Sequence, residues 1–233
     1  MTTPPIDRIL ITSRDFDEYI AMFDLSEADL STAPILDCPG GASDFACVAR
    51  SRGARVTSVD PIYAWPPQEL SAVVTAEIER GVRRSATAPE LYDFSWAGGV
   101  ERYIARRQRA AQSFLTDFIA ERDGGGSTNY VAGSLPSLGF PDRSFGLALV
   151  PNLLFAYSNL FDRSWHRASV RELIRVADEV RIHPITDTAG SPYGQLDVLR
   201  DELAADGIST RIAHVPCRLR RGTEETLVCL RGD

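Results

Sequence analysis

Two carboxylates occupy matching positions in the first third of the chain, where each ends a short apolar run. Asp37 ends the run 35–37 and is followed by a turn with Gly40 and Gly41, and Asp60 ends the run 55–60. Two parallel strands that each end in an acid, joined by a glycine-containing turn and a helix, form half of a nucleoside-binding site. We therefore expect Asp60 to hold a ribose diol and the glycines to let the backbone approach the ligand closely.

The carboxylate of Asp37 indicates which kind of nucleoside ligand suits this turn. A negative charge at this position repels a pyrophosphate but attracts the cationic end of an amino acid. The sequence therefore favours a nucleoside with an amino-acid tail over a dinucleotide. An alternative interpretation involves no ligand: Asp37 caps the turn, and Asp60 caps the helix that follows it.

The composition disfavours several classes of protein. The formal net charge is −7 and there is no basic block, so a broad nucleic-acid interface is not expected. All 25 basic residues are arginine. A pyridoxal enzyme needs a Schiff-base lysine and a P-loop normally needs its phosphate-binding lysine, so both classes are disfavoured. The histidines at 166, 183 and 214 show no metal-ligand spacing, and no metal site is expected.

The chain also lacks the patterns of membrane and secreted proteins. No apolar run reaches the roughly 18 residues of a membrane span, and residues 1–7 show no basic stretch followed by an apolar one. The four cysteines form no CxxC pair and are expected to be reduced and mostly buried. These observations predict a cytoplasmic protein.

Strands and helices alternate along the 233 residues, which predicts a single α/β domain with a doubly wound, mostly parallel sheet. An N-terminal helical segment at 1–32 precedes the sheet. The expected strands are 33–37, 55–60, 130–132, 145–150 and 178–185, followed by an antiparallel hairpin of 210–219 and 225–230. The expected helices include 15–23, 43–52, 163–176 and 196–206. This pattern is a Rossmann-like, seven-stranded sheet that binds ligands at the carboxyl ends of its strands.

An insertion at 61–129 separates the second and third expected strands. A standard crossover needs only one helix there, but this stretch predicts two, at 68–84 and 98–122. Long connections at the carboxyl ends of strands often carry function, so we expect a lid beside the ligand cleft. The alternative is a surface insertion that takes no part in binding.

Several stretches of the chain resemble the class I S-adenosylmethionine-dependent methyltransferases. Residues 36–43 (LDCPGGAS) are similar to the first motif of that family, and Val59-Asp60 is similar to its ribose-binding acid. Residues 133–145 resemble the family's "G-D-x-x-x-L-P-F-x-D-x-S-F-D" stretch, and 171–176 (RELIRV) resemble the helix before its fifth strand. The turn is similar to the DCPGG turn of a bacterial subgroup.

The chain departs from the family pattern at four positions. Pro39 and Ser43 replace glycines of the first motif, Ser134 replaces an acid that often contacts the adenine, and Gly146 replaces the acid of "SFD". The glycine pair at 40–41 still permits a tight turn, and Ser134 can still form a hydrogen bond. The departure at Gly146 is expected to affect the strand more than the ligand.

The resemblance implies S-adenosyl-L-methionine as cofactor and a small, apolar or aromatic molecule as methyl acceptor. Asp37 would answer the cofactor's ammonium, directly or through water, and Asp60 would accept both ribose hydroxyls. The implied cofactor-binding residues are Asp37, Pro39, Gly40, Gly41, Ser43, Asp60, Pro61, Ile62, Gly133, Ser134, Leu135, Pro151 and Asn152. Aromatic residues of the insertion and of 155–165 are expected to form the acceptor pocket; ordinary packing or a homodimer contact are their alternative uses.

Methyl transfer from a sulfonium is an in-line displacement, and a base is needed only when the acceptor must lose a proton. Tyr157 and His166 follow the fourth expected strand and are the candidate bases. Their alternatives are a wall of the pocket for Tyr157 and a helix surface for His166. Two other functions stay open. One is a non-catalytic methyltransferase-fold protein for ligand sensing or assembly; the other is an NAD(P)-dependent reductase, which the absence of G-x-G-x-x-G disfavours.

Overall fold

The centre of the computed structural model, which describes residues 7–125 and 129–232, is a seven-stranded sheet with the order β3-β2-β1-β4-β5-β7-β6. Strands β1 to β5 are parallel, and β7 runs antiparallel between β5 and β6. The strands are β1 (Ile35–Asp37), β2 (Val56–Val59), β3 (Tyr130–Val131), β4 (Phe145–Pro151), β5 (Ala177–His183), β6 (Ile208–His214) and β7 (Glu225–Arg231). This arrangement confirms the predicted α/β fold with its antiparallel hairpin.

Strand β4 occupies the middle of the sheet between β1 and β5. A parallel strand that is covered on both faces reads as an apolar run, and the sequence FGLALVP of β4 fits that rule. Packing explains the glycine at position 146 of this strand, because a Cβ there would collide with the Cβ of Ala33. The glycine that replaces the family's acid therefore belongs to the packing of β4 against the chain that enters β1.

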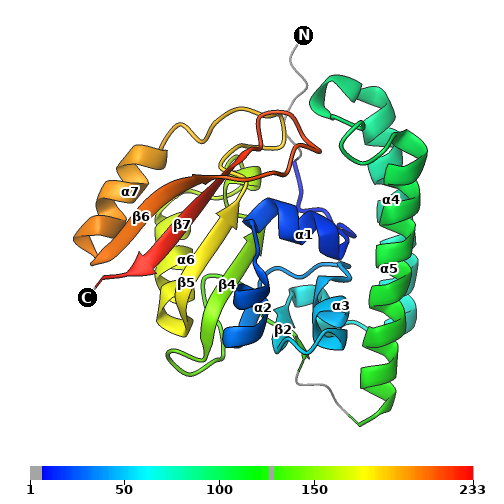
Figure 1. Ribbon diagram of the computed structural model, residues 1–233, viewed down its shortest axis with the longest axis horizontal. Helices are drawn as coiled ribbons and strands as arrows, with labels where there is room; N and C mark the ends of the chain where they lie inside the picture. The colour runs from blue at the N-terminus through cyan, green and yellow to red at the C-terminus, as the bar shows by residue number, and fades with distance from the viewer. Residues whose placement is uncertain (1–6, 126–128, 233) are drawn as a thin grey trace.

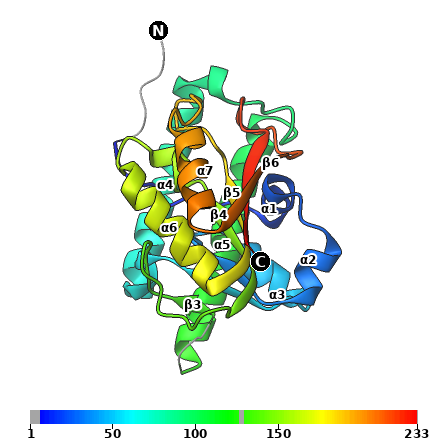
Figure 2. The same ribbon diagram turned by 90° about the vertical axis from the view of Figure 1, so that its left-hand side faces the viewer.

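Helices cover both faces of the sheet (Figure 1, Figure 2). Helices α1 (Phe16–Phe23) and α3 (Phe45–Ser51) pack on one face, where the rings of Tyr19 and Phe45 stack with centroids 4.4 Å apart. Helices α6 (Arg163–Val176) and α7 (Leu196–Ala205) pack on the other face. A short helix α2 (Glu27–Thr32) leads into β1.

The insertion forms two long helices, α4 (Pro67–Thr87) and α5 (Val100–Asp123), which lie side by side along one side of the molecule (Figure 1). Both helices begin and end within three residues of the positions predicted from the sequence. A short 3-10 helix at Pro61–Ala64 precedes them, and another at Pro89–Leu91 lies in the connection between them. Residues 126–128 of the predicted insertion lie outside the described residues.

Aromatic packing and ion pairs join the insertion to the sheet. The ring of Tyr63 packs against the rings of Phe114, Phe118 and Tyr130. On α3, Arg50 forms ion pairs with two carboxylates of α5, one of them Glu121 at 3.1 Å. The insertion is therefore part of the packed structure. In the part of the chain that the structure describes, no helix combines the length and apolarity of a membrane span.

Candidate functional site

A cavity of about 470 Å³ lies at the carboxyl ends of β1, β2 and β4. Its volume is in the range of small-molecule sites, roughly 300–1,000 Å³. Of the implied cofactor-binding residues, the structure brings together Pro39, Gly40, Gly41, Asp60, Pro61, Ile62, Gly133, Ser134, Leu135, Pro151 and Asn152 on its walls. Asp37 and Ser43 are not among the lining residues. We call this space the strand-end cavity.

The carboxylate of Asp60 lies in the wall of the strand-end cavity. Its Oδ1 accepts a hydrogen bond from the amide of Ile62 at 3.1 Å, and its Oδ2 accepts one from the amide of Gly41 at 3.0 Å. Burial raises the pKa of Asp60 to about 6. Because each carboxylate oxygen accepts more than one hydrogen bond, Asp60 caps the 3-10 helix and still has acceptor capacity for hydroxyl donors in the cavity.

The carboxylate of Asp37 lies beneath the glycine turn, away from the cavity wall. Its Oδ1 accepts a hydrogen bond from the Tyr19 hydroxyl at 3.0 Å, and its Oδ2 accepts one from the Ser58 hydroxyl at 2.9 Å. Burial raises the pKa of Asp37 to about 7. The sequence does not reveal this enclosure, because Tyr19 comes from α1 and Ser58 from β2. The residue supports the turn from below, and the geometry gives it no direct access to a ligand.

The glycines of the turn are required by close packing within the protein itself. A Cβ at Gly40 would lie 2.9 Å from the Cβ of Ser58 and 3.0 Å from Oδ2 of Asp37, and would also meet the Tyr63 hydroxyl. Gly41 has a φ of 56°, in the region that favours glycine. Ser43, which follows the turn, accepts a hydrogen bond from the Phe45 amide at 3.1 Å and so supports the start of α3.

Residues 8–12 and Arg14 line the cavity as well, although no pattern in the sequence predicts them in the site. The carbonyl of Thr12 accepts a hydrogen bond from the Ala42 amide at 3.1 Å, and the amide of Leu10 donates one to the Tyr157 hydroxyl at 3.0 Å. The segment therefore connects the glycine turn to the residues that follow β4. The available sequence signal was the apolar run 9–11, which falls in the segment 1–32 predicted to be helical but is not helical in the structure.

The two candidate bases have different positions. His166 is fully buried and does not line the strand-end cavity; its Nε2 lies 3.0 Å from the carbonyl of Leu154, and its ring stacks on Phe155. Burial lowers the pKa of His166. The structure contradicts both its assignment to the reactive side and the alternative of a surface position, because the apolar side of α6 carries it into the core.

Tyr157 lies in the wall of the strand-end cavity. Burial raises the pKa of its hydroxyl, which keeps the phenol neutral at physiological pH. The hydroxyl is also the acceptor for the Leu10 amide. These observations favour the alternative interpretation of Tyr157 as a wall of the pocket over its use as a base.

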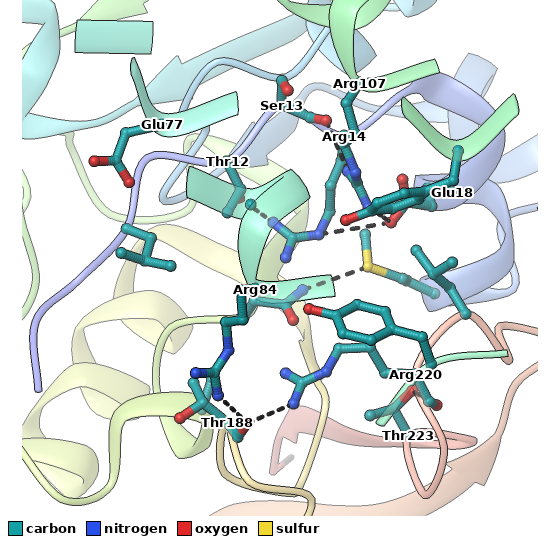
Figure 3. A pocket seen from close by; sticks show the side chains of 18 of the residues that line it. Thr12, Ser13, Arg14, Glu18, Glu77, Arg84, Arg107, Thr188, Arg220 and Thr223 are labelled. Carbon is teal, nitrogen blue, oxygen red and sulfur yellow. Dashed lines mark hydrogen bonds and ion pairs between the residues drawn. The ribbon is translucent and has the colours of Figure 1, made fainter. Parts of the chain in front are cut away.

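A second cavity of about 110 Å³ adjoins the first and shares with it residues such as Thr12, Arg14, Asn152 and Tyr157. Figure 3 shows that arginine side chains converge on it. The arginines that line it are Arg14, Arg84, Arg107 and Arg220, from the N-terminal segment, α4, α5 and the loop between β6 and β7. We call this space the arginine cavity.

The insertion contributes walls to both cavities. Glu77 of α4 lines both, and Arg84 of α4 and Tyr103 of α5 line the arginine cavity. Of the aromatic residues expected in an acceptor pocket, Trp65, Tyr157 and Trp165 line the strand-end cavity, and Tyr92 lines the arginine cavity. Four others, Tyr63, Phe94, Trp96 and Phe155, pack in the hydrophobic cores. The aromatic set therefore divides between cavity walls and ordinary packing.

Comparison with known proteins adds information about the fold. No protein-family model matches the chain. An uncharacterized protein of Methanocaldococcus jannaschii is 28% identical over 233 residues, and the match covers 97% of both chains. This relative is archaeal, and the bacterial subgroup suggested by the DCPGG turn is not supported by it.

Among solved structures, the bifunctional kinase-methyltransferase WbdD is 13% identical with a TM-score of 0.51, and the match covers 93% of this chain and 38% of that protein. A 1,6-didemethyltoxoflavin-N1-methyltransferase of Burkholderia thailandensis, solved with bound 1,6-didemethyltoxoflavin and S-adenosylhomocysteine, is 16% identical with a TM-score of 0.49, covering 94% of this chain and 80% of that one. At these identities the likeness to WbdD shows the fold alone: the chain has a methyltransferase-like α/β fold.

Proposed function

We propose that the protein is an S-adenosylmethionine-dependent methyltransferase that acts on a small molecule. The observation that carries this proposal is the position of Asp60, a buried carboxylate at the end of β2 that faces a cavity of nucleoside size. In parallel α/β sheets, ligands bind at the carboxyl ends of the strands, and an acid after the second strand suits a ribose diol.

The residues of the strand-end cavity suit this cofactor. The oxygens of Asp60 are bonded to two backbone amides and keep capacity for two hydroxyl donors. Ile62 and Leu135 offer apolar surface for an adenine, and Ser134 offers a hydroxyl beside them. The cofactor, when bound, supplies a methyl group on a sulfonium, which is a good leaving group. The protein then has to align the acceptor and exclude water.

Asn152 marks the place where cofactor and acceptor would meet, because it follows β4 and lines both cavities. Its φ of 51° is unusual for a residue other than glycine. The backbone amide of Asn152 donates a hydrogen bond to the carbonyl of His183 at 2.6 Å, which holds this conformation. Backbone in this region is often found at functional sites, and here it turns the chain at the junction of the two cavities.

The proposal is tested by calorimetric titration of the full chain with S-adenosylhomocysteine and, separately, with NADH. We expect micromolar binding of the first ligand only. Asp60→Ala removes the diol acceptor and should weaken this binding about 10- to 100-fold, since a hydrogen bond to a charged group contributes roughly 1.5–3 kcal/mol. Asp201→Ala, at an exposed acid on α7, is the matched control and should bind as the unaltered protein does.

Each other outcome identifies an alternative function. Binding of NADH alone would support a reductase and overturn the methyltransferase proposal. Binding of neither ligand would support a non-catalytic protein of this fold. If Asp60→Ala and the unaltered protein bind S-adenosylhomocysteine with equal affinity, Asp60 does not take part in binding it.

A further inference from the structure

Two arginine side chains in the arginine cavity approach the same backbone carbonyl. Nη2 of Arg84 lies 3.2 Å from the carbonyl oxygen of Thr188, and Nη2 of Arg220 lies 2.6 Å from it (Figure 3). Arg84 comes from α4, and Arg220 comes from the loop between β6 and β7. Two guanidinium groups that share one neutral acceptor repel each other, and this repulsion is strong in a partly buried site.

The carboxylates that line this cavity are already paired with other arginines. Glu18 lies 2.6 Å from Nη2 of Arg107, and Glu77 lies 2.6 Å from Nη2 of Arg8. Within residues 7–125 and 129–232, Arg84 and Arg220 form no ion pair with any carboxylate. The positive charge of the two side chains is therefore not neutralised by the protein.

The surroundings of Arg220 are the most unfavourable for its charge. Its Nε is buried and has no hydrogen-bond partner among the described atoms. Burial and the neighbouring guanidinium groups of Arg14 and Arg84 lower the pKa of Arg220. His183, which also lines the cavity, has its pKa lowered to about 3 by burial and by the guanidinium groups of Arg14 and Arg220, so it is neutral. A partly buried charge without a counter-charge is costly for a protein, and a bound anion would reduce that cost.

We propose that the arginine cavity binds an oxyanion, and that this oxyanion belongs to the molecule that is methylated. The second part rests on the proposed methyltransferase function. The guanidinium group is planar, and its parallel N–H donors match a carboxylate or a phosphate. The cavity of about 110 Å³ has room for such a group. The buried Nε of Arg220 is a hydrogen-bond donor that no described protein atom uses.

The wall that the two cavities share indicates how the acceptor would be oriented. An anionic end held by Arg84 and Arg220 places the rest of the molecule toward Asn152 and Tyr157, which line both cavities. The side chains of Tyr92 and Met22 provide apolar surface along the way. The acceptor class is therefore a small molecule with an apolar or aromatic body and one carboxylate or phosphate group.

The test uses three probes, each a phenyl ring with one polar substituent: benzoate, phenyl phosphate and benzyl alcohol. The first two are anions and the third is neutral. Each is titrated into the full chain, alone and with saturating S-adenosylhomocysteine. We expect one or both anions to bind and benzyl alcohol not to bind. The tighter of the two anions identifies the acceptor's group as a carboxylate or a phosphate.

Variants then locate the binding of the anion. Arg220→Met and Arg84→Met should each weaken the binding of the preferred anion at least tenfold. Arg218→Met is the matched control, because Arg218 lies in the same loop as Arg220 but is exposed; it should leave anion binding unchanged. Circular dichroism verifies that each variant is folded, and Arg84→Met decides the question if Arg220→Met does not fold.

The proposal is overturned if neither anion binds, if benzyl alcohol binds as tightly as the anions, or if both Arg84→Met and Arg220→Met bind the anion as the unaltered protein does. Failure of the methyltransferase proposal looks different: S-adenosylhomocysteine then does not bind to any of these proteins. In a further outcome, the anion binds in a way that depends on Arg84 and Arg220, but S-adenosylhomocysteine does not bind. This outcome would support the oxyanion site and contradict its assignment to a methyl acceptor.

Discussion

The strand-end cavity and the arginine cavity share a wall, yet most of their walls come from different parts of the chain, and the charged groups that characterise them differ in sign. The first lies on the ends of β1, β2 and β4, and its charged group at the strand ends is Asp60. The second is enclosed by α4, by the loop between β6 and β7 and by the N-terminal segment, and its unpaired charges are Arg84 and Arg220. Burial raises the pKa of Asp60 and lowers that of Arg220.

The comparison teaches that the two cavities suit ligands with different polar groups. A carboxylate with a raised pKa is stabilised by a cationic or hydrogen-bond-donating ligand, and an arginine with a lowered pKa is stabilised by an anionic one. A cofactor whose ribose hydroxyls donate to Asp60 and an acceptor with an oxyanion would satisfy both cavities at once. Four experiments test how separate the two cavities are, from the largest expected effect to the smallest.

The largest effect is expected from Gly40→Ala, which alters the strand-end cavity alone. The new Cβ would meet Ser58 and Asp37 at 3.0 Å or less. Overpacking of this kind costs typically 1–3 kcal/mol, and we expect a loss of about 3 kcal/mol in the free energy of unfolding, measured in urea, together with loss of S-adenosylhomocysteine binding. Gly139→Ala is the matched control, because a Cβ at Gly139 meets no atom within 4 Å. A stable Gly40→Ala protein would show that the turn is not tightly packed.

The second effect concerns Asp37, which supports the turn without facing the cavity. Its pKa is raised from 3.8 to about 7, so between these values the folded protein binds a proton that the unfolded chain has lost. Its contribution to stability is therefore full below pH 4 and decreases as pH rises toward 7, by about 1.4 kcal/mol per pH unit at most. Asp37→Asn should reduce the loss of stability between pH 5 and pH 7 by about 2 kcal/mol in urea unfolding. An unchanged pH profile would show that Asp37 is ionised at low pH.

The third effect separates the two cavities by pH. Protonation of Asp60 below its pKa of about 6 removes an acceptor for the ribose hydroxyls, so affinity for S-adenosylhomocysteine should fall as pH decreases, by about tenfold at most per pH unit below 6. Benzoate binding should stay constant between pH 5.5 and 8, because arginine keeps its charge there. Calorimetry at these pH values measures both. Asp60→Asn should abolish the first dependence; the same dependence in that variant would assign it to another group.

The smallest effect is expected from Tyr157→Phe, at the shared wall. The change removes the hydroxyl that accepts the Leu10 amide at 3.0 Å. One neutral hydrogen bond contributes about 0.5–1.5 kcal/mol, so thermal unfolding should show a loss of that size. Affinities for S-adenosylhomocysteine and benzoate should change less than about threefold. A large loss of methyl transfer with unchanged affinities would instead restore Tyr157 as a base.

The sequence predicts the fold well because local rules determine most of it. The apolar run of β4 and the periodic pattern of α6 are properties of consecutive residues, and α6 is found at the predicted residues 163–176. The strand-end cavity was predictable for a related reason. The carboxyl ends of neighbouring parallel strands meet at one edge of the sheet, so Asp60 and the glycine turn were expected to lie together.

The rest of the site depends on contacts between distant segments, which consecutive residues do not reveal. Arg84 and Arg220 are far apart in the sequence, and they meet only because the connection between α4 and α5 pairs with the loop between β6 and β7. The amide of Asp93 bonds there to the carbonyl of Leu219 at 2.8 Å. His166 shows the same limit, since its position on a helix does not reveal that its face of α6 is buried.

The sharing of one carbonyl by Arg84 and Arg220 has a consequence for how such a protein changes during evolution. Both arginines, and Thr188 between them, lie outside the strands of the sheet. Replacement of either arginine alters the group that the cavity attracts and leaves β1, β2 and β4 with their packing intact. Under the proposed function, selectivity for the acceptor can therefore diverge by single substitutions between lineages, while retention of the proposed cofactor site constrains the strand ends.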